Sequence, residues 1–144
     1  MRVPRSYLLV DDHPEDRMLA KEAFEQVCPT CVLTCVESAS AALDLLRNHH
    51  LIPDVMLLDL NMPGMNGFQL LEEMKQDGRL AQIPVVILTT SSARQDVERA
   101  YTLHASSYLV KSVDFDRFVE QLEKVLRYWQ ISRTMRDVGF PGKI

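Results

Sequence analysis

Short apolar runs alternate with longer amphipathic stretches along the whole chain. Five runs are mostly apolar and predict strands: residues 7–10, 31–36, 55–58, 84–88 and 108–110. The stretches between them repeat apolar residues at the three- and four-residue spacing of a helix face. Apolar strands separated by helices predict an α/β fold whose parallel sheet is covered on both faces. Five such units favour a doubly wound sheet in the flavodoxin-like order 2-1-3-4-5 over a barrel, which needs eight units.

Residues that favour helix starts precede these amphipathic stretches. Pro14 suits the first turn of a helix, where its missing N–H is not needed. Ser38, Asn66 and Asp114 have short polar side chains that can cap a helix N-terminus. Ser92 has capping-box spacing to a glutamine three residues later and is expected to open the fourth helix.

The last amphipathic stretch has the clearest helical stripe. Its predicted buried face consists of Phe115, Phe118, Leu122, Val125 and Trp129. The stripe fades after residue 131, so we expect one domain over residues 1–131 and a C-terminal tail over residues 132–144. The apolar residues of that tail are Met135, Val138, Phe140 and Ile144. The tail is therefore either a frayed terminus or an arm that packs on the domain or on a second subunit.

Composition and charge narrow the class of protein. At 144 residues, 47% apolar and 25% charged, the chain has ordinary globular composition and the size of one domain. A net charge of −4 argues against a broad nucleic-acid-binding face. The longest apolar runs are too short for a membrane span or for the core of a signal peptide. We therefore expect a cytoplasmic protein that binds neither nucleic acid nor membrane.

Polar side chains stand just past the ends of four predicted strands. They are Asp11 and Asp12, Asp59, Thr89 and Lys111. In doubly wound sheets the ligand crevice lies at the carboxyl ends of the strands, where the strand order reverses. In the order 2-1-3-4-5 that point falls between the first and third strands, so the three aspartates should converge there.

Three clustered carboxylates repel one another and must take up protons or bind a cation. Hard oxygen ligands suit Mg²⁺, which readily shares a phosphate oxygen. An aspartate can also act as a nucleophile and form an aspartyl-phosphate. Lys111 could then balance the charge of a phosphoryl group in transfer, and the Thr89 hydroxyl could donate a hydrogen bond to it.

Four motifs together resemble the receiver domain of response regulators. They are Leu-Val-Asp-Asp-His at residues 9–13, Leu-Leu-Asp-Leu-Asn-Met-Pro-Gly-Met-Asn-Gly at 57–67, Leu-Thr-Thr-Ser at 88–91 and Tyr-Leu-Val-Lys at 108–111. Each motif alone is weak, but their order at the expected strand ends is specific. The resemblance covers about residues 6–130.

The resemblance implies a role for each site residue. Asp59 would be the phospho-acceptor. Asp12, assisted by Asp11, would hold Mg²⁺ together with Asp59 and the backbone carbonyl of Asn61. Lys111 would pair with the phosphoryl group.

The resemblance also implies a switch and partners. Thr89 would be the switch hydroxyl and Tyr108 the switch aromatic, which rotates into the space that Thr89 vacates. The phosphoryl donor would be a phosphohistidine on a sensor histidine kinase, and a histidine phosphotransfer protein is a candidate downstream partner. A homodimer through the last helix or the tail would be one way to signal.

The sequence departs from the family pattern at two positions. Ser112 follows Lys111 where the family usually has proline, and Thr90 follows Thr89 where a small residue is common. We also expect no DNA-binding output domain after the receiver. The Lys-Ser pair, the Leu-Thr-Thr-Ser motif and the C-terminal extension resemble the single-domain regulators that partner bacterial phytochromes.

The remaining cysteine and histidine residues suggest no second site. Cys28, Cys31 and Cys35 include a Cys-x-x-Cys spacing, but we expect buried structural thiols because no histidine cluster is near in sequence. His13, beside the acidic pair, is either a plain surface residue or a contact for the incoming donor. His49 is expected on the surface.

Three other functions compete with the receiver hypothesis. A Mg²⁺-dependent aspartyl phosphatase typically needs a second acid two residues after its nucleophile, whereas Asp11 and Asp12 are adjacent. A flavin carrier needs a Ser/Thr/Gly phosphate loop after the first strand, where this chain has repelling carboxylates. A pseudo-receiver would bind partners without phosphorylation, although all the chemical positions are intact.

Overall fold

The computed structural model describes the backbone of residues 4–137 and the side chains of residues 4–130. Within this range the helices and strands alternate as predicted. The elements are β1 (Ser6–Val10), α1 (Pro14–Val27), β2 (Val32–Val36), α2 (Ala39–Asn48), β3 (Val55–Leu58), α3 (Gly67–Gln76), the short 3-10 helix η1 (Leu80–Gln82), β4 (Val85–Thr89), α4 (Arg94–Thr102), β5 (Ser107–Val110) and α5 (Phe115–Asp137).

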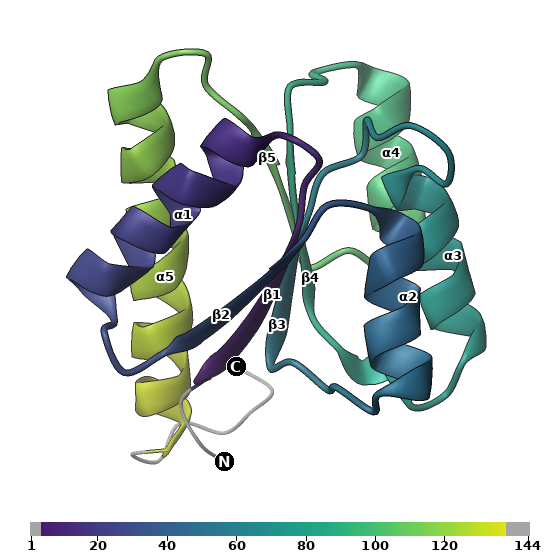
Figure 1. The fold of residues 1–144 in the computed structure, drawn as a ribbon, viewed down its shortest axis with the longest axis horizontal. Coiled ribbons are helices and arrows are strands. Elements are labelled where there is room, and N and C mark those ends of the chain that lie inside the picture. The colour runs from purple at the N-terminus through teal and green to yellow at the C-terminus, as the bar shows by residue number, and fades with distance from the viewer. Residues whose placement is uncertain (1–3, 138–144) are drawn as a thin grey trace.

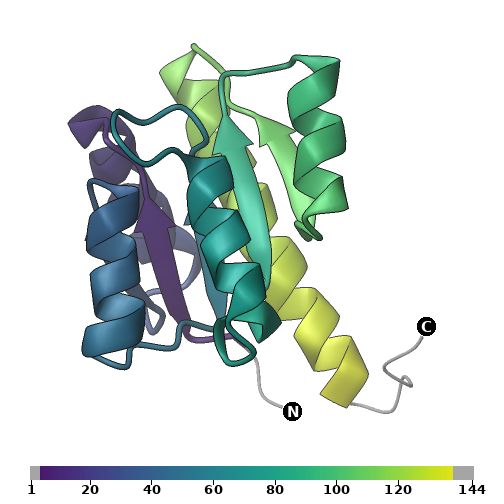
Figure 2. The ribbon, with the colours of Figure 1, turned by 90° about the vertical axis from the view of Figure 1, so that its right-hand side faces the viewer.

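The five described strands form one parallel sheet in the order β2-β1-β3-β4-β5, which confirms the predicted topology. Helices α1 and α5 cover one face, and α2, α3 and α4 cover the other (Figure 1). Figure 2 shows the latter three helices in front of the sheet, with the C-terminal part of α5 extending past it.

The register of the sheet brings the ends of the central strands to one edge. Val10 of β1 pairs with Leu58 of β3, and Leu58 pairs with Ile87 of β4. The Asp59 N–H then donates to the Val10 carbonyl at 3.0 Å. The residues that follow β1 and β3 therefore emerge side by side.

Alternation along the strands divides the buried side chains into two layers. Leu8 and Met56 face the layer under α2, α3 and α4, and Tyr7 and Leu57 face the layer under α1 and α5. Both layers are apolar, so the central strands are buried on both faces. This is why their sequences are apolar without alternation.

Most of the predicted helix starts are confirmed. Pro14 is the first residue of α1. The Ser38 hydroxyl accepts from the Ala41 N–H at 3.0 Å, and Asn66 forms a reciprocal capping box with Gln69. The Asp114 carboxylate accepts from the backbone of the first turn of α5. Local polar chemistry alone fixes these ends.

The prediction that Ser92 opens the fourth helix is wrong. The N-cap of α4 is Ala93. Ser91 takes over the local bonding instead: its hydroxyl accepts from the Ala93 N–H at 3.3 Å and donates to the Asp96 carboxylate at 2.6 Å. Capping-box spacing selected Ser92, whereas its neighbour Ser91 makes the local hydrogen bonds.

The predicted inner face of α5 is correct at four of its five positions. Phe118, Leu122 and Val125 are buried, and Trp129 packs against the same cluster. Phe115 is 57% exposed, which corrects the prediction for that residue. It stands on the first turn of α5, beyond the layer that the sheet covers.

Helix α5 continues to Asp137, although the apolar stripe predicted that it would fade after residue 131. Val138, Phe140 and Ile144 lie outside the described residues, as does the side chain of Met135. Packing of the tail therefore stays a prediction. No helix of the described residues is long and apolar enough to cross a membrane.

Two of the three cysteines are not the free buried thiols that we expected. Cys28 and Cys31 form a disulfide. The chain reverses direction between α1 and β2, where the Cys31 N–H donates to the Cys28 carbonyl at 3.0 Å. This turn sets the two Cα atoms 5.4 Å apart, a normal spacing for a disulfide. Cys35 remains free and half-buried, and burial raises the pKa of its thiol.

Candidate functional site

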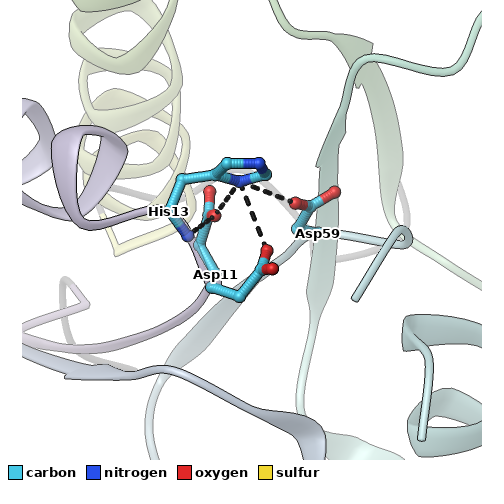
Figure 3. Close-up of side chains that lie close together, drawn as sticks. Asp11, His13 and Asp59 are labelled. Atoms are coloured by element: carbon cyan, nitrogen blue, oxygen red, sulfur yellow. Dashed lines mark hydrogen bonds and ion pairs between the residues drawn. The ribbon is translucent and has the colours of Figure 1, made fainter. Parts of the chain in front are cut away.

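The acidic cluster lies at the carboxyl ends of β1 and β3, where the sequence predicted it. Asp11 and Asp59 are only 1% and 2% exposed, and Asp12 is half-buried beside them. One oxygen from each of the three carboxylates and one nitrogen of His13 lie within 4.8 Å of one another. Figure 3 shows Asp11, His13 and Asp59 converging on one point.

Lys111 is the buried cation of the site. It follows β5 and is 5% exposed. Its Nζ donates to Asp11 Oδ2 at 3.0 Å and to Asp16 Oδ2 at 2.7 Å, and lies 3.5 Å from Asp59 Oδ2. Burial alone would lower the pKa of Lys111, but the hydrogen bond to Asp16 and the charges of Asp11 and Asp59 raise it above its usual value. The amine is therefore charged at neutral pH.

The surroundings of Asp59 disfavour the charged form of its carboxyl group. Burial raises the pKa of Asp59, while the charge of Lys111 opposes that shift and the charge of Asp11 adds to it. Asp59 Oδ1 accepts from the Asn61 N–H at 3.3 Å. Asp59 Oδ2 and Asp12 Oδ1 are buried without a hydrogen-bond partner in the described part of the chain. Such orphaned oxygens suit a site that binds a cation.

His13 is a member of the site that the sequence did not assign. Its Nδ1 lies 2.9 Å from Asp11 Oδ1, 3.3 Å from Asp12 Oδ1 and 3.6 Å from Asp59 Oδ2. The hydrogen bond to Asp11 raises the pKa of His13 above its usual value, and the charges of Asp11 and Asp12 act in the same direction against the effect of burial. The signal in the sequence was adjacency to the acidic pair.

Thr89 and Tyr108 are linked through the backbone of Ser91. The Ser91 N–H donates to the Thr89 hydroxyl at 3.4 Å, and the Tyr108 hydroxyl donates to the Ser91 carbonyl at 2.8 Å. The Asn61 side-chain amide also donates to the Thr89 hydroxyl at 3.2 Å. Thr89 is fully buried, Tyr108 is half-buried, and burial raises the pKa of Tyr108. Thr90 is exposed.

Gln121 of α5 holds the loop that contains Lys111. Its Oε1 accepts from the Ser112 N–H at 2.9 Å, and its Nε2 donates to the Val110 carbonyl at 2.8 Å. The Lys111 N–H donates to the Thr89 carbonyl at 2.6 Å. The peptide groups on both sides of Lys111 are therefore fixed. Serine at position 112 supplies an N–H that proline lacks.

We expect Ser112→Pro to lower the free energy of unfolding by about 1–3 kcal/mol, because it leaves Gln121 Oε1 without its donor. Ser112→Ala is the matched control, because alanine keeps the N–H while also losing the hydroxyl that accepts from the Asp114 N–H. Urea denaturation of both variants measures the difference. Equal stability of the two variants would contradict this role for Gln121.

Comparisons with known proteins place the chain in a family. The model of the response regulator receiver domain matches residues 7–123. The chain is 33% identical over 131 residues to response regulator Rcp1 of Synechocystis sp., covering 88% of this chain and 89% of that protein. It is 38% identical over 130 residues to the probable methanogenesis regulatory protein FilR2 of Methanothrix harundinacea, covering 88% and 84%.

Solved structures of response regulators are also similar to this chain. The Mn²⁺-bound form of Rcp1 superposes with a TM-score of 0.83 at 32% identity, covering 88% of this chain and 95% of that one. The phosphorylated cyanobacterial phytochrome response regulator RcpA gives 0.81 at 29% identity, covering 87% and 94%.

This chain belongs to the response regulator receiver domain family. Receiver domains work with histidine kinases in two-component signalling, so the chain is a signalling protein rather than a phosphatase or a flavin carrier. The narrower resemblance to regulators associated with phytochromes is confirmed, because Rcp1 and RcpA are among its relatives. The structure brings the predicted residues Asp11, Asp12, Asp59 and Lys111 together at the carboxyl edge of the sheet.

Proposed function

We propose that Asp59 accepts a phosphoryl group from a phosphohistidine of a sensor histidine kinase. The observation that carries this proposal is the state of Asp59 Oδ2, which is buried without a hydrogen bond in the described residues and lies 3.5 Å from the Lys111 amine. In the transfer, an Asp59 oxygen forms a bond to phosphorus while the bond from phosphorus to the donor imidazole breaks. Lys111 stabilises the negative charge that the phosphoryl oxygens carry.

The residues of the site fit a bound Mg²⁺. The carboxylates of Asp11, Asp12 and Asp59 and the carbonyl of Asn61 would hold it. Two of these carboxylates have an orphaned oxygen, and oxygen ligands suit a hard cation. The metal would neutralise phosphoryl charge during transfer. The crystal structure of the relative Rcp1 in a Mn²⁺-bound form supports a divalent cation here.

Phosphorylation would be read out through Thr89 and Tyr108. The modification adds a phosphoryl group with a charge of about −1.5 to −2 and new acceptor oxygens beside the β4 end. The Thr89 hydroxyl would turn to donate to one of them. Thr89 and Tyr108 both form hydrogen bonds with the backbone of Ser91. Movement of Thr89 would therefore change the contact that holds the Tyr108 hydroxyl. Tyr108 would then rotate into the vacated space and change the surface of α4, β5 and α5.

The family and its relatives support two of the proposed partners. A phytochrome-type histidine kinase is supported by the similarity to RcpA, and a histidine phosphotransfer protein would take the phosphoryl group onward. We also propose that the chain consists of a cytoplasmic receiver domain at residues 1–131 and a C-terminal tail at residues 132–144. The last helix or the tail would form a homodimer. A hollow of about 320 Å³ on α5, lined by the exposed Tyr128 and the half-buried Trp129, supports this surface.

Intact mass after incubation with acetyl phosphate and Mg²⁺ tests the proposed chemistry. Wild-type protein is expected to gain one phosphoryl group, because a small donor can replace the phosphohistidine. Asp59→Asn should gain none, because it lacks the nucleophile. Asp44→Asn, at an exposed aspartate of α2, is the matched control and should behave like wild type. A chelator should abolish the adduct in wild type and in Asp44→Asn.

Labelling of Asp59→Asn at the wild-type rate would show that another residue is the acceptor. An unlabelled wild-type protein should be tested again with a phosphorylated histidine kinase, since Thr90 could close the site to small donors. Failure with both donors would leave a receiver that binds partners without phosphorylation.

A further inference from the structure

His13 directs its side chain into the acidic cluster rather than onto its own helix. It occupies the N-cap position of α1, but its side chain makes no capping hydrogen bond within the described residues. Its backbone N–H donates to Asp11 Oδ1 at 2.9 Å, which anchors the residue beside the cluster. The ring then extends over the cluster with Nδ1 facing the carboxylates (Figure 3).

The distances around Nδ1 match the spacing of ligands around one cation. Neighbouring ligands of an octahedral ion with bonds of about 2.1 Å lie about 3.0 Å apart. Nδ1 lies 2.9 Å from Asp11 Oδ1 and 3.3 Å from Asp12 Oδ1, with Asp59 Oδ2 somewhat farther at 3.6 Å. The imidazole nitrogen thus lies at about the spacing of neighbouring ligands from three carboxylate oxygens, and all four atoms are close enough to share one cation.

A second observation shows that the imidazole does not satisfy the cluster by itself. Asp12 Oδ1 and Asp59 Oδ2 remain without a hydrogen-bond partner among the described residues, although Nδ1 is near both. The side chain of Asp59 is almost fully buried, so it is shielded from bulk water. A cation bound between these groups would take the place of the Nδ1 proton that Asp11 accepts, and that proton would leave to solvent. The cation would then satisfy both oxygens and the nitrogen at once.

The nitrogen changes which cation the site prefers. Mg²⁺ is hard and selects oxygen ligands, whereas imidazole nitrogen is a good ligand for first-row transition metals such as Co²⁺ and Zn²⁺. We propose that His13 is a direct metal ligand and that it makes this site selective for transition-metal dications over Mg²⁺. This inference rests on the metal site in the proposed function, and it adds a ligand and a class of metal to it.

Calorimetric titration of unphosphorylated protein with Co²⁺ and with Mg²⁺ tests the selectivity. His13→Ala is expected to weaken Co²⁺ binding by at least about tenfold, since losing even an outer partner of a metal ligand has that effect. Mg²⁺ affinity should change by less than about threefold, because Mg²⁺ prefers oxygen and keeps several waters. His49→Ala removes an exposed histidine at the end of α2 and should leave both affinities unchanged.

Pulsed EPR of the Mn²⁺-loaded protein tests the bond directly. Coupling of the electron spin to an imidazole nitrogen is expected in wild type and in His49→Ala, and it should vanish in His13→Ala. Absence of this coupling in wild type would overturn the proposal. Equal weakening of Co²⁺ and Mg²⁺ in His13→Ala would also overturn it, as would tighter binding of both metals, which would make the imidazole a competitor of the cation.

The outcomes separate this inference from the proposed function. Phosphorylation of Asp59 with Mg²⁺, combined with unchanged metal preference in His13→Ala, would refute the ligand alone. Nitrogen-coupled Mn²⁺ in a protein that no donor can phosphorylate would refute the phospho-acceptor alone.

Discussion

Replacing Lys111 by methionine is expected to lower the free energy of unfolding by about 3–5 kcal/mol, the usual cost of removing one partner from a buried ion pair. The Lys111 amine is buried and compensates the carboxylates of Asp11, Asp16 and Asp59. Methionine fills a similar volume but leaves three acidic groups facing one another. Because Asp11 and Asp59 are shielded from water, solvent cannot replace the lost cation.

Urea denaturation in the presence of a chelator measures this effect without a bound metal. Lys124→Met is the matched control, because Lys124 is exposed on α5 and its replacement should change stability by less than about 0.5 kcal/mol. Adding Asp59→Asn to Lys111→Met should recover part of the loss, because one uncompensated carboxylate is removed. If the Lys111 variant is as stable as wild type, the acidic cluster does not depend on this amine.

The sheet and the acidic residues at its edge were predictable from sequence for one physical reason. Strands buried on both faces must be apolar along their whole length, so a polar residue marks the point where the strand ends and leaves the two apolar layers. Asp59 follows the fully buried strand β3 in this way. Lys111 follows β5, which is a partly buried strand at the edge of the sheet. Parallel strands then carry all such residues to the same edge.

His13, Asp16 and Gln121 were not predicted as parts of the site. The positions of His13 and Asp16 depend on how the first turn of α1 is placed over the end of β1, which no periodicity in the sequence specifies. Gln121 reaches the Lys111 loop from the second turn of α5, and nothing in its own neighbourhood marks it as a loop partner. These contacts are properties of packing between elements.

Two wrong predictions have a related cause. Phe115 continues the apolar spacing of α5, but spacing describes one face of a helix and does not show where the neighbouring layer ends. The pairing of Cys28 with Cys31 depends on the reversal of the chain after α1. The Cys-x-x-Cys spacing alone does not show whether the chain closes into a turn between the two residues.

Replacing Gly67 by alanine is expected to lower the free energy of unfolding by at least about 2–3 kcal/mol, at the upper end of the usual cost of overpacking. Gly67 is the first residue of α3, and its N–H donates to the Leu60 carbonyl at 3.0 Å. A Cβ there would lie 2.5 Å from the Asp59 carbonyl oxygen and 2.8 Å from the Leu60 Cα. Both neighbours are backbone atoms of the segment that carries the acceptor, so no side chain can turn away to make room.

The same clash should also slow phosphorylation of Asp59. It can be relieved only by moving α3 away from Asp59 or by shifting the Asp59 backbone. A displacement of about 1 Å can slow a reaction that depends on positioning by roughly a hundredfold. Phosphorylation of Gly67→Ala by acetyl phosphate should therefore be much slower than that of wild type. The rates are compared at a temperature at which urea denaturation curves show that both proteins are folded without urea. Gly78→Ala is the matched control, since a Cβ there meets no atom within 4 Å and the substitution should leave stability and rate nearly unchanged. A wild-type rate in folded Gly67→Ala would mean that α3 yields to the added methyl group, and that the close approach at Gly67 serves packing rather than the position of Asp59.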